Sequence, residues 1–79
     1  MQTIFVQLKC DLGSAYDVAM VLAEQEGVSE VYSISGQYDL LAKCYLDDGK
    51  DIGRYVATRI QNLDGVRDTY TTITFNAFT

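Results

Sequence analysis

An internal repeat in the sequence restricts the folds that this chain can adopt. Residues 26–33 and residues 64–71 both read acid-Gly-Val-x-acid-x-Tyr-hydroxyl. The same spacing carries four apolar positions onto apolar partners, namely Val18 onto Val56, Ala19 onto Ala57, Leu22 onto Ile60 and Leu8 onto Leu46. Chance similarity between two strand beginnings is the alternative. The extent of the match favours two copies of one strand-helix-strand unit.

The spacing of apolar residues predicts four strands. Residues 3–10 alternate between two faces, which indicates a strand of period two. One of those faces is apolar throughout and carries Ile4, Val6, Leu8 and Cys10. Further strands are expected over residues 28–35, residues 40–46 and residues 66–78, the last of which is rich in threonine, tyrosine and phenylalanine.

Apolar residues at helical spacing predict two helices. The first begins after Ser14, a good N-cap with Asp17 three residues later, and it ends near Gly27. The second is expected over residues 50–63, although Gly53 inside it costs about 1 kcal/mol relative to alanine. With these helices, the order of elements is β-α-β-β-α-β.

Two such units with right-handed crossovers interleave into one four-stranded antiparallel sheet with both helices on one face. This is the ferredoxin-like α+β fold, and we expect residues 1–79 to form a single domain of this kind. Pairing of the first and third strands sets Cys10 and Cys44 toward opposite ends of the sheet. An intrachain disulfide would contradict that order, and we expect both thiols to be small buried hydrophobic groups.

The arrangement leaves the second face of the sheet uncovered. On the first and third strands that face carries Phe5, Gln7, Leu41, Lys43 and Tyr45. For the second and fourth strands, the sequence leaves open which set of alternate residues faces the helices. Hydrophobic residues make up 48% of the 79 residues, a surplus for so small a domain. We therefore expect two copies to pair sheet to sheet as a two-fold dimer, a dimeric α+β barrel.

Composition argues against several classes of function. The chain has 6 basic and 11 acidic residues, and the basic ones form no run, so we expect no direct binding to nucleic acid. No apolar run approaches the roughly 20 residues of a membrane span, and a signal peptide's layout is missing, which predicts a cytoplasmic location. Because the chain has no histidine, no activated nucleophile and no phosphate-binding loop, we predict no catalytic residue, metal site or cofactor.

The candidate site is the stretch Ser35-Gly36-Gln37-Tyr38-Asp39, between the second and third strands. Gly36 allows the positive φ that a tight reversal needs, and Asp39 places a carboxylate at the start of the returning strand. Such a carboxylate could hold an ammonium group through a charge-assisted hydrogen bond, or the stretch could be only a turn.

Residues 31–41 and residues 60–71 resemble the effector-binding domain of the Lrp/AsnC transcriptional regulators, which is also called the RAM domain. The resemblance covers essentially the whole chain. It implies a dimer that assembles into rings, such as octamers, and that binds free amino acids at contacts between dimers to regulate transcription or amino-acid metabolism. The ligand-binding residues that it implies are Gly36, Gln37, Tyr38, Asp39, Thr69, Thr71 and Thr72.

Full-length members of this family carry a helix-turn-helix domain ahead of the effector-binding domain, whereas the first strand here begins almost at Met1. The sequence therefore looks like a stand-alone RAM domain without DNA binding of its own. It would act through partners, of which full-length Lrp/AsnC-type regulators are one class. Two alternatives stay open here: a small dimeric α+β barrel enzyme of the monooxygenase or isomerase kind, and a structural adaptor without a ligand.

Overall fold

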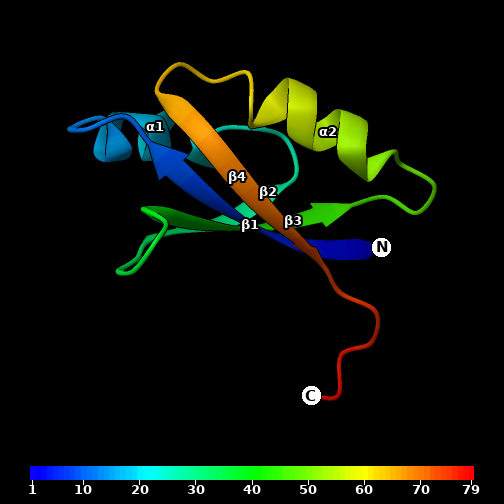
Figure 1. Ribbon diagram of the computed structural model, residues 1–79. Coiled ribbons are helices and arrows are strands. Elements are labelled where there is room, and N and C mark those ends of the chain that lie inside the picture. Colours follow the sequence, from blue (N-terminus) through cyan, green and yellow to red (C-terminus); the bar gives the residue numbers. More distant parts are fainter.

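The computed structural model describes residues 1–79, and the six elements follow the predicted order (Figure 1). They are β1 (Gln2–Cys10), α1 (Ala15–Ala23), β2 (Val28–Ser33), β3 (Leu40–Leu46), α2 (Ile52–Arg59) and β4 (Val66–Ile73). The strands form one antiparallel sheet in the order β2-β3-β1-β4. Both helices lie on one side of this sheet, which confirms the ferredoxin-like α+β fold.

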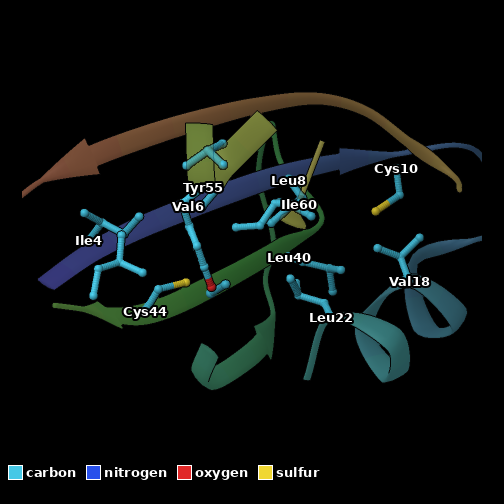
Figure 2. Packing of buried hydrophobic residues seen from close by; sticks show 13 residues of the cluster. Ile4, Val6, Leu8, Cys10, Val18, Leu22, Leu40, Cys44, Tyr55 and Ile60 are labelled. Atoms are coloured by element: carbon cyan, nitrogen blue, oxygen red, sulfur yellow. The ribbon is translucent and has the colours of Figure 1, made fainter. Parts of the chain in front are cut away.

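The hydrophobic core lies between the sheet and the two helices (Figure 2). Alternate residues of β1 and β3 point into it, as the period-two pattern predicted. Its 13 members are Ile4, Val6, Leu8, Cys10, Val18, Leu22, Leu40, Ala42, Cys44, Leu46, Tyr55, Val56 and Ile60. Three of the four repeat pairs are buried at both positions, namely Val18 with Val56, Leu22 with Ile60 and Leu8 with Leu46. The repeat therefore reflects equivalent core positions in the two units.

The two cysteines are buried and free, as expected. Cys44 lies opposite Ile4 in the register of β1 and β3, whereas Cys10 follows the last pair of that ladder. The thiols therefore point into opposite ends of the core. Neither α1 nor α2 has the length and apolar character needed to cross a membrane.

Helix α2 is shorter than the 50–63 range that the sequence indicated. The carboxylate of Asp51 accepts a hydrogen bond from the Arg54 N–H at 3.0 Å, so Asp51 is the N-cap and the helix begins after it. At the other end, the Gln61 N–H donates to the Val56 carbonyl at 2.8 Å, which closes the helix in a wider turn. Beyond the helix, Ile60 is still a member of the core and Leu63 packs against it, although neither residue is helical.

Helix α1 also ends before the predicted position, at Ala23 rather than near Gly27. Ser14 occupies the N-cap position, but its side chain makes no capping hydrogen bond. Gly27 has a positive φ of +90°, as a helix-ending glycine would, yet it lies directly ahead of β2 and serves that strand instead.

Two strands are shorter than expected. β2 ends at Ser33, where its pairing with Leu40 ends. β4 ends at Ile73 rather than near residue 78, because β1, its only neighbour, begins at Gln2 and offers nothing to pair with beyond that point. The last contact is a pair of hydrogen bonds from Thr74 to the Thr3 carbonyl. Residues 74–79 then leave the sheet on the side away from the helices (Figure 1).

The register settles which residues of the outer strands face the open side of the sheet. Tyr32 of β2 lies opposite Leu41, and Tyr70 of β4 lies opposite Gln7, so both rings join the uncovered face. This open face comprises Phe5, Gln7, Glu30, Tyr32, Leu41, Lys43, Tyr45, Tyr70 and Thr72. Its aromatic side chains are largely uncovered, with Tyr32 and Tyr70 more than half exposed.

Gly27 and Gly65, which are partners in the repeat, join the two units. The carbonyl of Gly27 accepts a 2.8 Å hydrogen bond from the Tyr45 N–H, and the carbonyl of Gly65 accepts one of 2.8 Å from the Asp11 N–H. Each glycine thus ties the start of an outer strand to the end of a central strand from the other unit. Both have a φ of +90°, which disfavours any residue with a side chain.

Each of these glycines also lies against the helix of the other unit. A Cβ at Gly27 would be 2.9 Å from the Tyr55 hydroxyl oxygen and 3.1 Å from the Tyr45 carbonyl oxygen. A Cβ at Gly65 would be 2.9 Å from Cγ2 of Val18. The Tyr55 hydroxyl donates to the carbonyl of Glu26 at 2.6 Å, and burial raises the pKa of this phenol well above its ordinary value.

We predict that Gly27→Ala destabilises the protein far more than Gly49→Ala does. Gly49 has a similar φ of +85°, but a Cβ there would meet no atom within 4 Å. The comparison therefore isolates the close approach at Gly27 from backbone strain alone. Urea unfolding should give a free energy that is lower by about 1–3 kcal/mol for Gly27→Ala than for Gly49→Ala. Equal losses would mean that the contact with α2 contributes nothing.

Candidate functional site

The loop between β2 and β3 forms the predicted reversal. Gly36 has a φ of +106°, which confirms the need for glycine at this position. Gly36 and Gln37 are exposed at the tip of the loop, and a Cβ at Gly36 would meet nothing within 4 Å. The Ile34 N–H donates to the Asp39 carbonyl at 3.0 Å and closes the loop at its base.

Asp39 is fixed at the end of β1 rather than free in the loop. Its N–H donates to the Leu8 carbonyl at 2.8 Å, and its Oδ2 accepts a hydrogen bond from the Cys10 N–H at 2.8 Å. The second carboxylate oxygen, Oδ1, has no hydrogen-bond partner within the chain. Asp39 therefore has a structural role through one oxygen and an available acceptor in the other.

A pocket of about 340 Å³ opens beside this carboxylate. It lies where the end of β1, the loop to α1 and the start of β4 meet. The lining residues are Lys9, Cys10, Asp11, Leu12, Gly13, Ala15, Tyr16, Asp39 and Arg67. Acidic, basic and apolar side chains are all present, and the size lies at the lower end of the range for small-molecule sites.

The ionisable groups around this pocket include an exposed ion pair, Arg67 with Asp11, and the buried thiol of Cys10. Arg67 Nε lies 3.8 Å from an Asp11 carboxylate oxygen, and both side chains are about 60% exposed, so this ion pair stabilises the fold little and can rearrange. Burial raises the pKa of the Cys10 thiol, and the Asp39 and Asp11 carboxylates raise it further. Cys10 is therefore a protonated thiol and a poor nucleophile. No group of three or more His, Cys, Asp or Glu residues could hold a metal ion.

The mouth of the pocket continues into uncovered apolar side chains that run from the loop before α1 onto the helix. Leu12 of that loop is 98% exposed, and Tyr16 and Met20, which are one turn apart on α1, are 75% and 71% exposed. We call these three residues the α1 stripe. Large apolar side chains that gather on a surface in this way mark a contact with another molecule more often than an isolated exposed residue does.

The seven residues implied by the resemblance do not form one group within the chain. Only Asp39 lines the pocket. Tyr38 turns toward the open face, where its ring centroid is 6.2 Å from that of Tyr70. Thr72 lies on the same open face, opposite Phe5.

Thr69 and Thr71 lie on β4, on the helix side of the sheet, opposite Leu8 and Val6. The hydroxyl of Thr69 accepts a hydrogen bond from the Gln61 amide at 2.8 Å. Since β1 separates β4 from β3, these threonines and Asp39 lie on opposite sides of the central strand. Their joint role in ligand binding stays a prediction.

The sequence reasoning missed Leu12, Tyr16 and Arg67. Arg67 is matched with Ser29 at a variable position of the repeat, so the repeat does not indicate a role for it. Tyr16 carried a usable signal, because an aromatic residue off the apolar stripe of an amphipathic helix has nothing to pack on in the monomer. The pocket itself depends on three segments that only the fold brings together.

Comparisons with known proteins agree with this architecture. The sequence matches the family model of the Lrp/AsnC ligand binding domain over residues 3–79. An uncharacterized HTH-type transcriptional regulator from Pyrococcus horikoshii is 33% identical over 76 residues, which are 92% of this chain and 51% of that protein. The chain thus spans about half the length of the curated relatives it matches.

Solved structures share the fold over the entire chain. TTHA0845 from Thermus thermophilus has a TM-score of 0.92 and 34% identity, with 100% of this chain and 99% of that chain covered. A transcriptional regulator from Neisseria meningitidis in complex with L-Met has a TM-score of 0.85 at 15% identity, over 99% of this chain and 52% of that chain.

Replacing Asp39 by alanine should destabilise the fold, because the Cys10 N–H then loses its acceptor at the end of β1. We expect the free energy of unfolding to fall by about 1–2 kcal/mol in Asp39→Ala. Asp39→Asn keeps an oxygen acceptor and should recover most of that loss. Urea denaturation of both variants measures the difference, and equal stability of all three proteins would contradict the structural role of Asp39.

Proposed function

Because the chain belongs to the Lrp/AsnC ligand-binding domain family, we propose that it is an oligomeric module that binds free amino acids and regulates transcription or amino-acid metabolism through partner proteins. The observation that carries this proposal is the divided carboxylate of Asp39. One oxygen is held by the backbone of β1, and the other is free beside a pocket of about 340 Å³.

The pocket offers complementary groups for a zwitterion. The free Asp39 oxygen would accept from the ligand ammonium group through a charge-assisted hydrogen bond. Arg67 also lines the pocket and would exchange its weak pairing with Asp11 for the ligand carboxylate, to which a guanidinium can donate two parallel hydrogen bonds. Leu12 and Tyr16 would contact an apolar amino-acid side chain.

In this proposal, assembly completes the site. The open face pairs two copies sheet to sheet, and the α1 stripe supplies a second contact through which dimers join into rings. Such a contact would cover the pocket and exclude water, which strengthens the ionic hydrogen bonds inside it. Gly36, Gln37 and Tyr38 and the threonines of β4 would then meet the ligand only from a neighbouring copy. Binding and assembly are consequently linked.

The relatives support an amino-acid ligand and a regulatory context. The family is defined by ligand binding, and a Neisseria regulator with the same fold forms a complex with L-Met. The curated relatives are transcriptional regulators about twice as long as this chain. Mixed assembly with such longer regulators, in the cytoplasm, would change how many DNA-binding domains one oligomer carries. Catalysis has no place in the proposal, which follows the regulatory context of the family.

The proposal predicts that particular amino acids stabilise the protein against heat. A ligand at about one hundred times its Kd adds about 2.7 kcal/mol to the free energy of unfolding, which raises the Tm of a domain this small by several degrees. A thermal-shift panel of the twenty amino acids measures this effect. The response should be lost in Asp39→Asn, which keeps the fold but removes the charge that pairs with the ammonium group.

Asp48→Asn is the matched control. Asp48 is an exposed aspartate at the far end of β3, so this variant should keep the full response. Arg67→Gln should weaken binding and leave the preference among amino-acid side chains unchanged, since Arg67 meets only the shared carboxylate. A panel in which no amino acid raises the Tm of the wild type would overturn the proposal.

A further inference from the structure

Residues 74–79 carry the most exposed aromatic side chains of the molecule. Phe75 is 93% exposed and Phe78 is 94% exposed, although this segment follows directly from a paired strand. The segment reads Thr-Phe-Asn-Ala-Phe-Thr and contains no ionisable side chain. Two phenylalanines with almost no contact to their own domain need a surface to cover them.

The segment extends on the open side of the sheet, away from both helices (Figure 1). A hollow of about 660 Å³ separates it from the sheet. On one side the hollow is lined by Phe5, Lys43 and Tyr45 of the open face, and on the other by Phe75 and its neighbours in the segment. The segment therefore stands beside the open face without packing on it, and leaves room for another element between them.

We propose that residues 74–79 form an arm that packs on a second copy of this chain, with Phe75 and Phe78 of each copy covered by the open face of the other. The inference rests on the proposed sheet-to-sheet dimer, and it assigns the strongest contacts of that dimer to Phe75 and Phe78. Two-fold symmetry makes the exchange reciprocal, since the arm and the face that receives it belong to the same surface of each copy. The arm of one copy enters the space that the other copy leaves uncovered.

The chemistry of the two surfaces fits a second copy. An uncharged aromatic arm suits a face whose charges are already paired within the chain. Lys43 is 3.6 Å from a carboxylate oxygen of Glu30 and lies 5.2 Å from the centre of the Tyr45 ring, and the Tyr32 hydroxyl donates to Glu30. The exposed parts of the Tyr32, Tyr45 and Tyr70 rings are then available for apolar contact.

The arm adds exposed apolar area to what a dimer can bury. A specific interface buries about 800 Å² on each partner. Each aromatic side chain can bury about 150–250 Å². Phe75 and Phe78 are almost fully exposed and have nearly all of that area left to bury, whereas Tyr32, Tyr45 and Tyr70 are about half exposed. The arm is therefore assigned the leading contribution.

Site-specific photo-crosslinking tests the arm directly. The photo-reactive analogue p-benzoylphenylalanine, placed at position 75 of the full chain, should link to β1 or β3 of another copy and give a covalent dimer on a denaturing gel. Mixing isotope-labelled and unlabelled chains identifies which copy each peptide comes from in the mass spectrum. A link confined to one chain would overturn the inference and indicate that the arm folds back on its own sheet.

Sedimentation measures the energetic contribution. Replacing both phenylalanines by serine should raise the dimer Kd at least tenfold, while replacing both by leucine, which keeps apolar bulk, should raise it less. Val21→Ser removes an exposed apolar side chain from the helix layer and should leave the dimer Kd unchanged. An unchanged dimer Kd in the serine variant would overturn the arm alone, whereas a wild type that is monomeric at every concentration would overturn the dimer beneath it. The amino-acid panel tests the ligand site independently of both.

Discussion

The close approach of Gly27 and Gly65 to the opposite half of the molecule determines how the rest of the structure is arranged. Each glycine carbonyl holds the end of a central strand, and each Cα lies against the other unit's helix. A Cβ at either position would lie 2.9 Å from a side-chain atom of that helix, closer than a normal contact. At one end this contact fixes Asp11, and therefore the end of β1 on which Asp39 and the pocket depend.

The glycine contact recurs at both ends of the molecule, but the surfaces around Gly27 and Gly65 differ. Near Gly27 the ring of Tyr55 fills the space, its hydroxyl bonds to Glu26, and the remaining hollow is about 130 Å³. In the repeat, the partner of Tyr55 is Asp17, an exposed acid that fills nothing. The end near Gly65 is open by comparison, with about 340 Å³ beside Asp39. The two repeat units thus differ at this position, with Tyr55 at the closed end of the molecule and Asp17 at the open end.

The sequence was most informative where one face of an element is fully buried. Alternation in β1 and β3 predicted the core and the open face residue by residue, because a shift of one position would expose Ile4 or Leu40. The outer strands have no fully buried residue on either face, so the face to which each side chain belongs followed only from the register. The ends of the helices depended on single hydrogen bonds, such as the one that Asp51 accepts at the start of α2. Helix propensity alone does not predict which residue makes such a bond. The pocket could not be predicted, since Leu12, Asp39 and Arg67 come from three segments.

The two uncovered surfaces of the domain lie on opposite sides of the sheet. The open face and the arm lie on one side of the sheet, whereas the α1 stripe lies in the helix layer on the other side. A closed ring of dimers needs two distinct contacts on each copy, one within the dimer and one between dimers. In the proposed assembly, a pocket beside the second contact rather than the first would leave the dimer intact while a ligand changed how dimers join. A domain too small to enclose a charged ligand alone would then use its own assembly to do so.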